Sequence, residues 1–287
     1  MTGSSDPDEQ TQASPVAQSQ SIRLPYAPGV LQFGELHLPG PGGIHPTVIL
    51  IHGGFWRTPY DYTLMTGLAK DLAKRGIAAW NIEYRRIGDP QGGWPATLLD
   101  VARAADHLRI IAAKYALDLQ RVVTVGHSAG GHLALWLAAR PRITTGSTLS
   151  GAGAPGSPAG ESALPLAISG AISLAGVSDL AMGWSMKLGD EAVAELLGGS
   201  PGDVPERYAT ASPAAMLPLG VPQVLIHGTA DDRVPFAMSQ AYAAAAQAAG
   251  DQATLIELKN QDHFVLIDPH SAAWTITVNA LQQLLAI

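Results

Sequence analysis

Short apolar runs alternate with longer segments of helical spacing along most of this chain. Residues 47–51 (TVILI), 121–125 (RVVTV) and 221–226 (VPQVLI) are apolar runs of strand length. Between such runs, apolar residues recur every three or four positions, as in residues 62–74 and 94–117. Strands that alternate with helices of ten or more residues are typical of βαβ units. The chain is therefore predicted to form an α/β protein with a mostly parallel, doubly wound sheet and helices on both faces.

The same alternation of apolar runs and helical segments predicts the other strands and helices and indicates a single domain. Residues 22–287 are predicted to form this single domain, and residues 1–21, which are rich in Ser, Gln, Asp and Pro, a flexible tail. Residues 178–219 interrupt the rhythm with Gly, Pro and Trp, which predicts a lid or pocket insertion. The other predicted strands are residues 77–84, 167–174 and 254–258, and the other predicted helices are residues 130–139, 239–249 and 271–285.

Composition excludes several classes of protein. The 287 residues contain 17 Lys and Arg against 24 Asp and Glu, a net charge of −7, so no basic surface for nucleic acid is expected. The absence of cysteine excludes disulfides, thiolate nucleophiles and cysteine-ligated zinc, and no paired-histidine motif indicates another metal site or a cofactor. Without an apolar run of membrane-spanning length or a signal peptide, we predict a soluble cytoplasmic protein that does not bind membranes. The sequence does not indicate an oligomeric state.

A candidate nucleophile lies where a predicted strand turns directly into a predicted helix. Residues 126–130 read GHSAG, a G-x-S-x-G pattern, after the RVVTV strand and before a helix rich in Ala and Leu. A serine on such a sharp turn projects its Oγ clear of the sheet, and the small neighbours allow close backbone packing. The alternative is a chance glycine-rich turn that carries a serine. The context favours Ser128 as the nucleophile of an acyl-transfer reaction.

A glycine-rich loop follows the TVILI strand. Residues 52–56 read HGGFW, and acyl transfer requires hydrogen-bond donors where a carbonyl oxygen becomes an oxyanion. The backbone N–H groups of Gly53, Gly54 and Phe55, with that of Ala129 after the candidate nucleophile, are predicted to supply these donors. The alternative is a plain Gly-Gly turn beside a buried tryptophan.

Two later strand ends carry a candidate acid and base. Asp231 follows the VPQVLI strand in HGTADDRVP, and His263 follows residues 254–258 in DHF. The order Ser128, Asp231, His263 is the chain order of the α/β-hydrolase triad, in which the histidine takes the serine proton and the acid fixes its tautomer. Asp232 is the rival acid, and its other interpretation is a solvated turn residue or a partner of Arg233.

These four motifs together resemble the α/β-hydrolase superfamily from about residue 22 onward. The HGG-x-W pattern resembles the kynurenine formamidase (arylformamidase) and carboxylesterase branch, whereas the hormone-sensitive-lipase branch has a third glycine at Phe55. The resemblance implies an α/β-hydrolase fold, the acid at Asp231 and the base at His263. It implies a serine hydrolase that cleaves small ester or aryl amide bonds through an acyl-enzyme.

Other functions stay open at this point. An exopeptidase or acyl-peptide hydrolase is one alternative, although no large gating domain is present to support it. A non-catalytic binding protein of the same fold is another, although such proteins typically lack part of the triad or the oxyanion loop. Trp56 and Trp184 are candidate substrate-pocket residues, with packing of helices onto the sheet as the equal alternative.

Overall fold

The computed structural model describes residues 20–150 and 164–287. These residues form one eight-stranded sheet in the order β1-β2-β4-β3-β5-β6-β7-β8. The pairs β1–β2 and β2–β4 are antiparallel, and all later neighbours are parallel. The strands are β1 (Gln20–Pro25), β2 (Phe33–Leu38), β3 (His45–Ile51), β4 (Ala78–Ile82), β5 (Leu117–His127), β6 (Gly170–Leu174), β7 (Gln223–Gly228) and β8 (Ala253–Leu258). The predicted mostly parallel sheet is confirmed.

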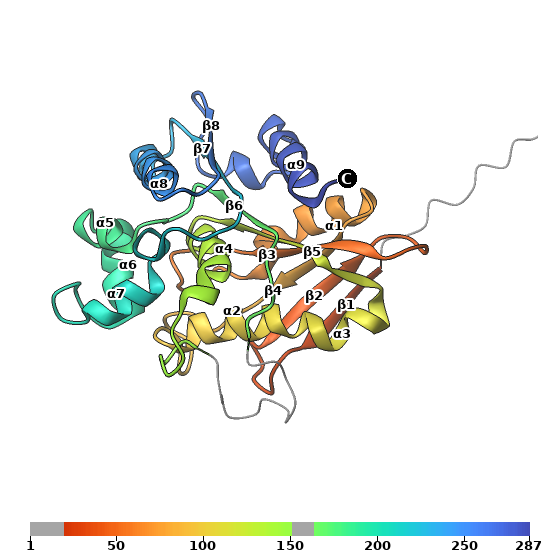
Figure 1. Cartoon of the computed structure of the whole chain (residues 1–287), viewed down its shortest axis with the longest axis horizontal. Coiled ribbons are helices and arrows are strands. Elements are labelled where there is room, and N and C mark those ends of the chain that lie inside the picture. The colour runs from red at the N-terminus through yellow and green to blue at the C-terminus, as the bar shows by residue number, and fades with distance from the viewer. Residues whose placement is uncertain (1–19, 151–163) are drawn as a thin grey trace, which may run out of the picture.

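Helices cover both faces of the sheet, as predicted. One apolar core lies between the sheet and α1 and α9, and the other lies between the sheet and α2, α3, α4 and α8. Figure 1 shows α1 and α9 above the sheet and α2 and α3 below it. The helices are α1 (Thr66–Lys74), α2 (Ala96–Asp106), α3 (Leu108–Tyr115), α4 (Ala129–Ala139), α5 (Leu180–Ser185), α6 (Leu188–Leu197), α7 (Pro205–Ala211), α8 (Phe236–Ala248) and α9 (Ala272–Leu285), with short 3-10 turns η1 (Tyr62–Met65), η2 (Arg140–Arg142), η3 (Pro213–Met216) and η4 (Val265–Ile267).

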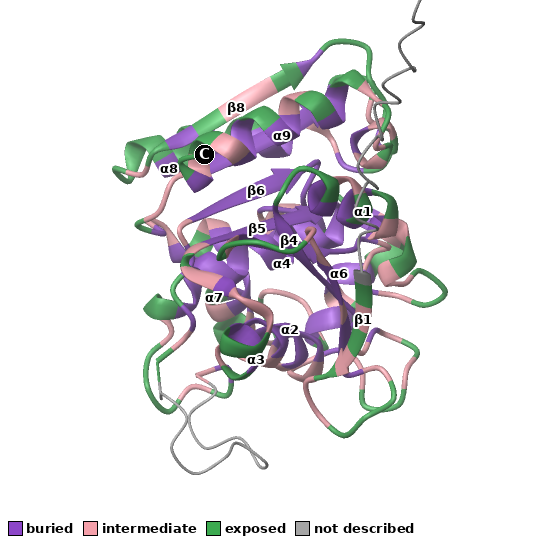
Figure 2. Cartoon of the chain, turned by 90° about the vertical axis from the view of Figure 1, so that its right-hand side faces the viewer, coloured by how far each residue is buried: buried purple, intermediate pink, exposed green. Residues whose placement is uncertain are grey.

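The central strands are buried on both faces, which explains their continuous apolar runs. In β3, Val48 and Leu50 join the core under α1 and α9, whereas Ile49 and Ile51 join the opposite core. Successive side chains of a strand point to opposite faces, so a strand covered on both sides needs apolar residues at every position. Figure 2 shows this burial in the middle of the sheet and exposed residues on the edge strands β1 and β8.

Some boundaries differ from the sequence prediction. Strands β1 and β2 were not predicted, and β1 includes the last two residues of the predicted tail; residues 1–19 lie outside the described part of the chain. The single helix predicted over residues 94–117 is two helices that meet at His107, and Leu117 begins β5. Residue 117 enters the sheet because the chain reverses at Ala116, which has a φ of 52° in the left-handed region that ends many helices.

The segment predicted as an insertion, residues 178–219, lies between β6 and β7. It contains α5, α6, α7 and η3, and the three helices lie side by side at one end of the molecule (Figure 1). No described helix is long and apolar enough to cross a membrane. Because parallel strands end at the same edge of a sheet, the loops after β3, β5, β7 and β8 meet there, and these loops carry the candidate site residues.

Candidate active site

Ser128 occupies a strained turn between β5 and α4. Its backbone angles, φ 57° and ψ −122°, are ones that residues other than glycine rarely adopt. Glycines on either side make the turn possible: a Cβ on Gly126 would lie 1.9 Å from the carbonyl oxygen of Gly130, and a Cβ on Gly130 would lie 2.1 Å from that of Ile51. Strain of this kind is concentrated at functional sites, where the surrounding structure holds it. The GHSAG sequence thus forms the strand-to-helix turn that its pattern predicts.

His263 and Asp231 lie in contact. Nδ1 of His263 is 2.6 Å from Oδ2 of Asp231, whose side chain is fully buried. The other carboxylate oxygen, Oδ1, accepts the backbone N–H groups of Arg233 and Val234 at 2.8 and 2.9 Å. An ionised carboxylate only accepts, so the proton of this contact belongs to Nδ1. A neutral His263 ring therefore has its Nε2 unprotonated.

A second histidine holds the same carboxylate. Nε2 of His227 lies 3.1 Å from Oδ2 of Asp231, and its Nδ1 faces Oγ of Ser239 at 2.7 Å. Burial by itself raises the pKa of Asp231, but the hydrogen bonds from His227 and His263 outweigh burial and hold the pKa well below its ordinary value. Asp231 is therefore negatively charged at neutral pH.

The rival acid, Asp232, lies in a different environment. Its side chain is 71% exposed, and its Oδ1 lies 3.4 Å from Nε of Arg233. No contact joins it to His263 within the described residues. Of the two neighbouring aspartates, Asp231 is therefore buried against His263 and Asp232 is exposed to solvent.

His127 joins the turn at Ser128 to the loop of His263. Its Nε2 donates to the backbone carbonyl oxygen of His263 at 2.9 Å, and the two imidazole rings lie 4.4 Å apart between centroids. Burial, assisted by the nearby His263, lowers the pKa of His127 to about 3, so its ring is neutral. The residue before the candidate nucleophile thus fixes the position of the candidate base.

The HGGFW loop passes next to Ser128. A Cβ on Gly53 would lie 2.9 Å from Cβ of Ser128, so only glycine allows the approach. Within the described part of the chain, the backbone N–H groups of Gly54, Phe55 and Ala129 have no hydrogen-bond acceptor. The first N–H of a helix has no partner inside the helix, which leaves that of Ala129 open to an acceptor near Ser128. The start of the HGGFW loop and the N-terminus of α4 therefore both lie beside Ser128.

The two candidate pocket tryptophans lie in different surroundings. Trp56 is fully buried, and its Nε1 donates to Nδ1 of His132 at 3.2 Å, so its indole packs against α4. Trp184, on α5, is 39% exposed. The packing alternative therefore describes Trp56, which supports α4 from the HGGFW loop.

The insertion is anchored to the HGGFW loop by Arg57. The guanidinium group donates to Oε2 of Glu195 at 2.7 Å and to the backbone carbonyl oxygens of Gly189 and Asp190. Gly189 also packs against Phe55, because a Cβ on it would lie 2.6 Å from that ring. Sequence analysis did not find this anchor, and no local pattern around Arg57 indicates it.

His132 provides a measurable pH dependence of stability. Its Nε2 donates to the carbonyl oxygen of Ala211 at 2.8 Å, and burial lowers its pKa to about 4. In the unfolded chain this histidine has its ordinary pKa of about 6.5. Between about pH 4 and 6.5 the unfolded chain therefore binds a proton at this residue that the folded protein does not bind. Stability therefore falls as pH drops from about 6.5 toward 4, by about 1.4 kcal/mol per pH unit for one proton.

Replacing His132 with glutamine is expected to reduce this slope by about one proton. Urea unfolding at several pH values between 4 and 6 measures it, and the slope can be compared with the wild type even if the variant is less stable at every pH. An unchanged slope would show that His132 takes up its proton in the folded protein.

Comparisons with known proteins agree with this fold. The chain is 29% identical to Esterase LipQ of Mycobacterium tuberculosis over 257 residues, 85% of this chain and 57% of that protein. It is 35% identical to Kynurenine formamidase avaC of Aspergillus versicolor over 111 residues, 34% of this chain and 37% of that protein. The matched part of the chain thus spans less than two thirds of the length of each of these relatives.

Solved structures give the same fold over nearly the whole chain. A truncated carbohydrate esterase from gut microbiota superposes with a TM-score of 0.78 at 21% identity, covering 96% of this chain and 99% of that one. The protein therefore has the α/β-hydrolase fold. The family model named BD-FAE matches residues 36–245, well over half of the chain. This protein belongs to the BD-FAE family.

Proposed function

We propose that this protein is a serine hydrolase that cleaves small carboxylic esters through an acyl-enzyme. The contact of 2.6 Å between His263 and the buried Asp231, next to the strained turn of Ser128, is the observation that carries the proposal. A base held in one tautomer beside a serine at a helix N-terminus is the arrangement that activates a hydroxyl for attack. The similarity to an esterase over 85% of the chain supports the reaction class.

Each residue has a role in the proposed reaction. Nε2 of His263 takes the proton of the Ser128 hydroxyl as Oγ attacks the ester carbonyl carbon. Backbone N–H groups of the loop from Gly53 to Phe55, with that of Ala129, stabilise the oxyanion of the tetrahedral intermediate. The imidazolium then protonates the leaving alcohol, and the bond from carbon to that oxygen breaks. Water, deprotonated by the same nitrogen, releases the acid and restores Ser128.

Aryl formamides are the second proposed substrate class. The acyl-enzyme route is the same for an amide as for an ester, except that the leaving amine needs the proton from His263 before the bond breaks. The similarity to a kynurenine formamidase over a third of the chain supports this class. We further propose that the insertion, which Arg57 holds against the HGGFW loop, forms one wall of the substrate pocket and limits the size of the acyl group.

Covalent labelling and a substrate panel test the proposal together. A fluorophosphonate is expected to add once per chain, and peptide mass spectrometry should locate the adduct on Ser128. The panel compares p-nitrophenyl esters of increasing acyl length with an aryl formamide and an aminoacyl p-nitroanilide, and esters are expected to give the highest kcat/KM. A chain that neither reacts nor turns over would be a binding protein, and a preference for the anilide would indicate an exopeptidase.

A further inference from the structure

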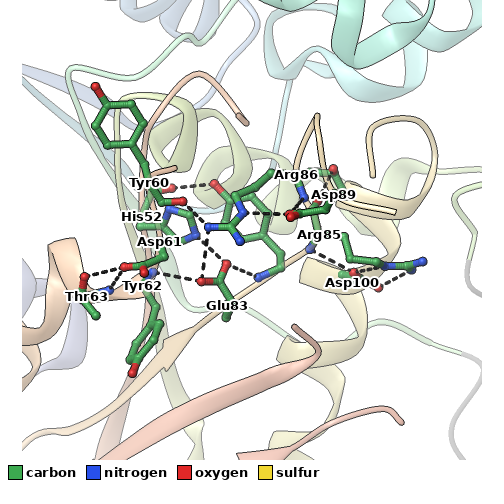
Figure 3. Close-up of polar contacts among 12 residues, drawn as sticks. His52, Tyr60, Asp61, Tyr62, Thr63, Glu83, Arg85, Arg86, Asp89 and Asp100 are labelled. Atoms are coloured by element: carbon green, nitrogen blue, oxygen red, sulfur yellow. Dashed lines mark hydrogen bonds and ion pairs between the residues drawn. The ribbon is translucent and has the colours of Figure 1, made fainter. Parts of the chain in front are cut away.

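One buried carboxylate holds both ends of the loop that carries the candidate oxyanion donors. Glu83 follows β4 directly and is 2% exposed. Its Oε1 lies 3.0 Å from Nε2 of His52, where the loop begins, and its Oε2 accepts the backbone N–H of Tyr62 at 3.2 Å, where the loop ends. Figure 3 shows Glu83 between these two residues. The two ends of the loop, ten positions apart in the sequence, therefore share one acceptor group.

Arg86 adds a second hold on the same loop. Its backbone N–H and its Nε both donate to Oδ2 of Asp89, at 2.8 and 3.0 Å, which fixes the side chain. One terminal guanidinium nitrogen donates to the backbone carbonyl oxygen of Tyr60 and lies 3.6 Å from Oε2 of Glu83 (Figure 3). The positive charge of Arg86 thus compensates the buried negative charge of Glu83 while it binds the loop.

The held residues contact the backbone that carries the donors. Gly54, Phe55 and Trp56 have φ angles of 109°, 49° and 55°, so three successive residues are in the left-handed region. The side chain of Tyr60 packs on the first of them, since a Cβ on Gly54 would lie 2.4 Å from Cβ of Tyr60. A conformation that chains rarely adopt persists only where its surroundings hold it. Here the surroundings include Tyr60 and the two side chains that fix the loop ends.

We propose that Glu83, together with Arg86, positions the oxyanion loop for catalysis. The inference rests on the proposed function, because it assigns the loop its role in the acyl transfer. Donors to an oxyanion act through placement, and a misplacement of about 1 Å can cost about 10²-fold in rate. Among the described residues, no hydrogen bond or ion pair joins Glu83 to Ser128, so its effect passes through His52 and Tyr62.

Glu83→Gln tests the proposal because glutamine keeps the shape and removes one acceptor. Oε1 of Glu83 accepts from His52 and, at 2.8 Å, from the backbone N–H of Tyr84, while Oε2 accepts from Tyr62 and faces Arg86. An NH₂ group at the Oε2 position would face the backbone N–H of Tyr62 and the guanidinium group of Arg86. At the Oε1 position it would face the backbone N–H of Tyr84, and His52 would have to move its ring proton to Nδ1, which faces the carbonyl oxygen of Gly53 at 2.8 Å. We expect kcat/KM for a p-nitrophenyl ester to fall about 10- to 100-fold.

Two inhibitors separate positioning from general damage. An alkyl trifluoromethyl ketone forms an oxyanion with the candidate nucleophile, so its inhibition constant is expected to rise by the same factor as kcat/KM falls. The corresponding alcohol forms no oxyanion, and its inhibition constant is expected to change less than about twofold. The proposal would be overturned if the inhibition constants of both inhibitors rose equally, or if neither changed.

Asp100→Asn is the matched control. Asp100 is also a fully buried carboxylate, paired with Arg85 at 2.7 Å next to Arg86 (Figure 3), and it accepts from Gln32 at 2.6 Å. It contacts no residue from 52 to 62 in the described structure. The variant is expected to lose thermal stability and to keep kcat/KM and both inhibition constants. A ketone-specific loss in Asp100→Asn as large as that in Glu83→Gln would contradict a role particular to Glu83.

If Glu83→Gln yields no folded protein, Arg86→Lys carries the test. Lysine keeps the charge beside Glu83 and Asp89 but lacks the fork that also reaches Tyr60, so the same ketone-specific loss is expected at about tenfold. Folded, fully active Arg86→Lys would then overturn the proposal. Failure of the proposed function looks different, because in that case the wild-type protein itself would neither hydrolyse esters nor be labelled at Ser128.

Discussion

Replacing Ser128 with alanine is expected to lower kcat for ester hydrolysis by about 10⁶ and to abolish fluorophosphonate labelling. The variant keeps the turn and its glycines but lacks the oxygen that forms the acyl-enzyme. Initial rates with a p-nitrophenyl ester measure the loss, and circular dichroism checks the fold. The best control is Ser173→Ala: Ser173 is fully buried on β6, and its Oγ makes no hydrogen bond within the described residues. That variant is expected to keep wild-type kcat.

If Ser128→Ala kept a tenth of the wild-type turnover, Ser128 could not be the nucleophile. The strained φ of 57° at this residue would then need another explanation.

Asp231→Asn is expected to lower kcat by about 10⁴. The asparagine oxygen can take the place of Oδ1 and accept from Arg233 and Val234, but its NH₂ group then faces the donors of His263 and His227. His263 avoids this clash by moving its proton to Nε2, the tautomer that cannot accept the proton of Ser128. Kinetics at saturating ester, with the melting temperature recorded in parallel, measure the effect.

Asp232→Asn provides the comparison for Asp231→Asn. Its carboxylate is 71% exposed and pairs only with Arg233 in the described structure, so kcat is expected to change less than about twofold. Equal losses in the two variants, or the larger loss at Asp232, would contradict the proposed acid.

The buried parallel strands could be predicted because their sequences have few other interpretations. Residues 47–51 and 121–125 are apolar at nearly every position, which suits a strand covered on both faces. Strand β2 was not predicted because its sequence, FGELHL, mixes apolar and polar residues, as expected for an antiparallel strand next to the edge of the sheet. The break between α2 and α3 also escaped, since His107 itself has helical angles, φ −59° and ψ −24°.

The candidate site was predictable only in part. Ser128 directly follows β5, and Asp231 and His263 lie in the loops just after β7 and β8. Parallel strands place those ends at one edge of the sheet, so the order of motifs indicated the cluster. The supports around it were not predictable, because their partners are far apart in the sequence. His127 binds the carbonyl of a residue 136 positions away, and Arg57 reaches Gly189 across 132 positions. Only the packing of loops determines such pairs.

The position of β5 in the sheet divides the proposed machinery into two exchangeable halves. Strands β3 and β4, on one side of β5, precede the oxyanion loop and Glu83, whereas β7 and β8, on the other side, precede Asp231 and His263. The loop and Glu83 precede Ser128 in the chain, the remaining oxyanion donor, Ala129, begins α4, and all of the second half follows α4. A chimera of two homologues joined after α4 would therefore combine the charge stabilisation of one parent with the proton transfer of the other. The contacts that such recombination must keep include the β5–β6 pairing, the bond from His127 to His263, the bond from His132 to Ala211 and the Arg57 anchor.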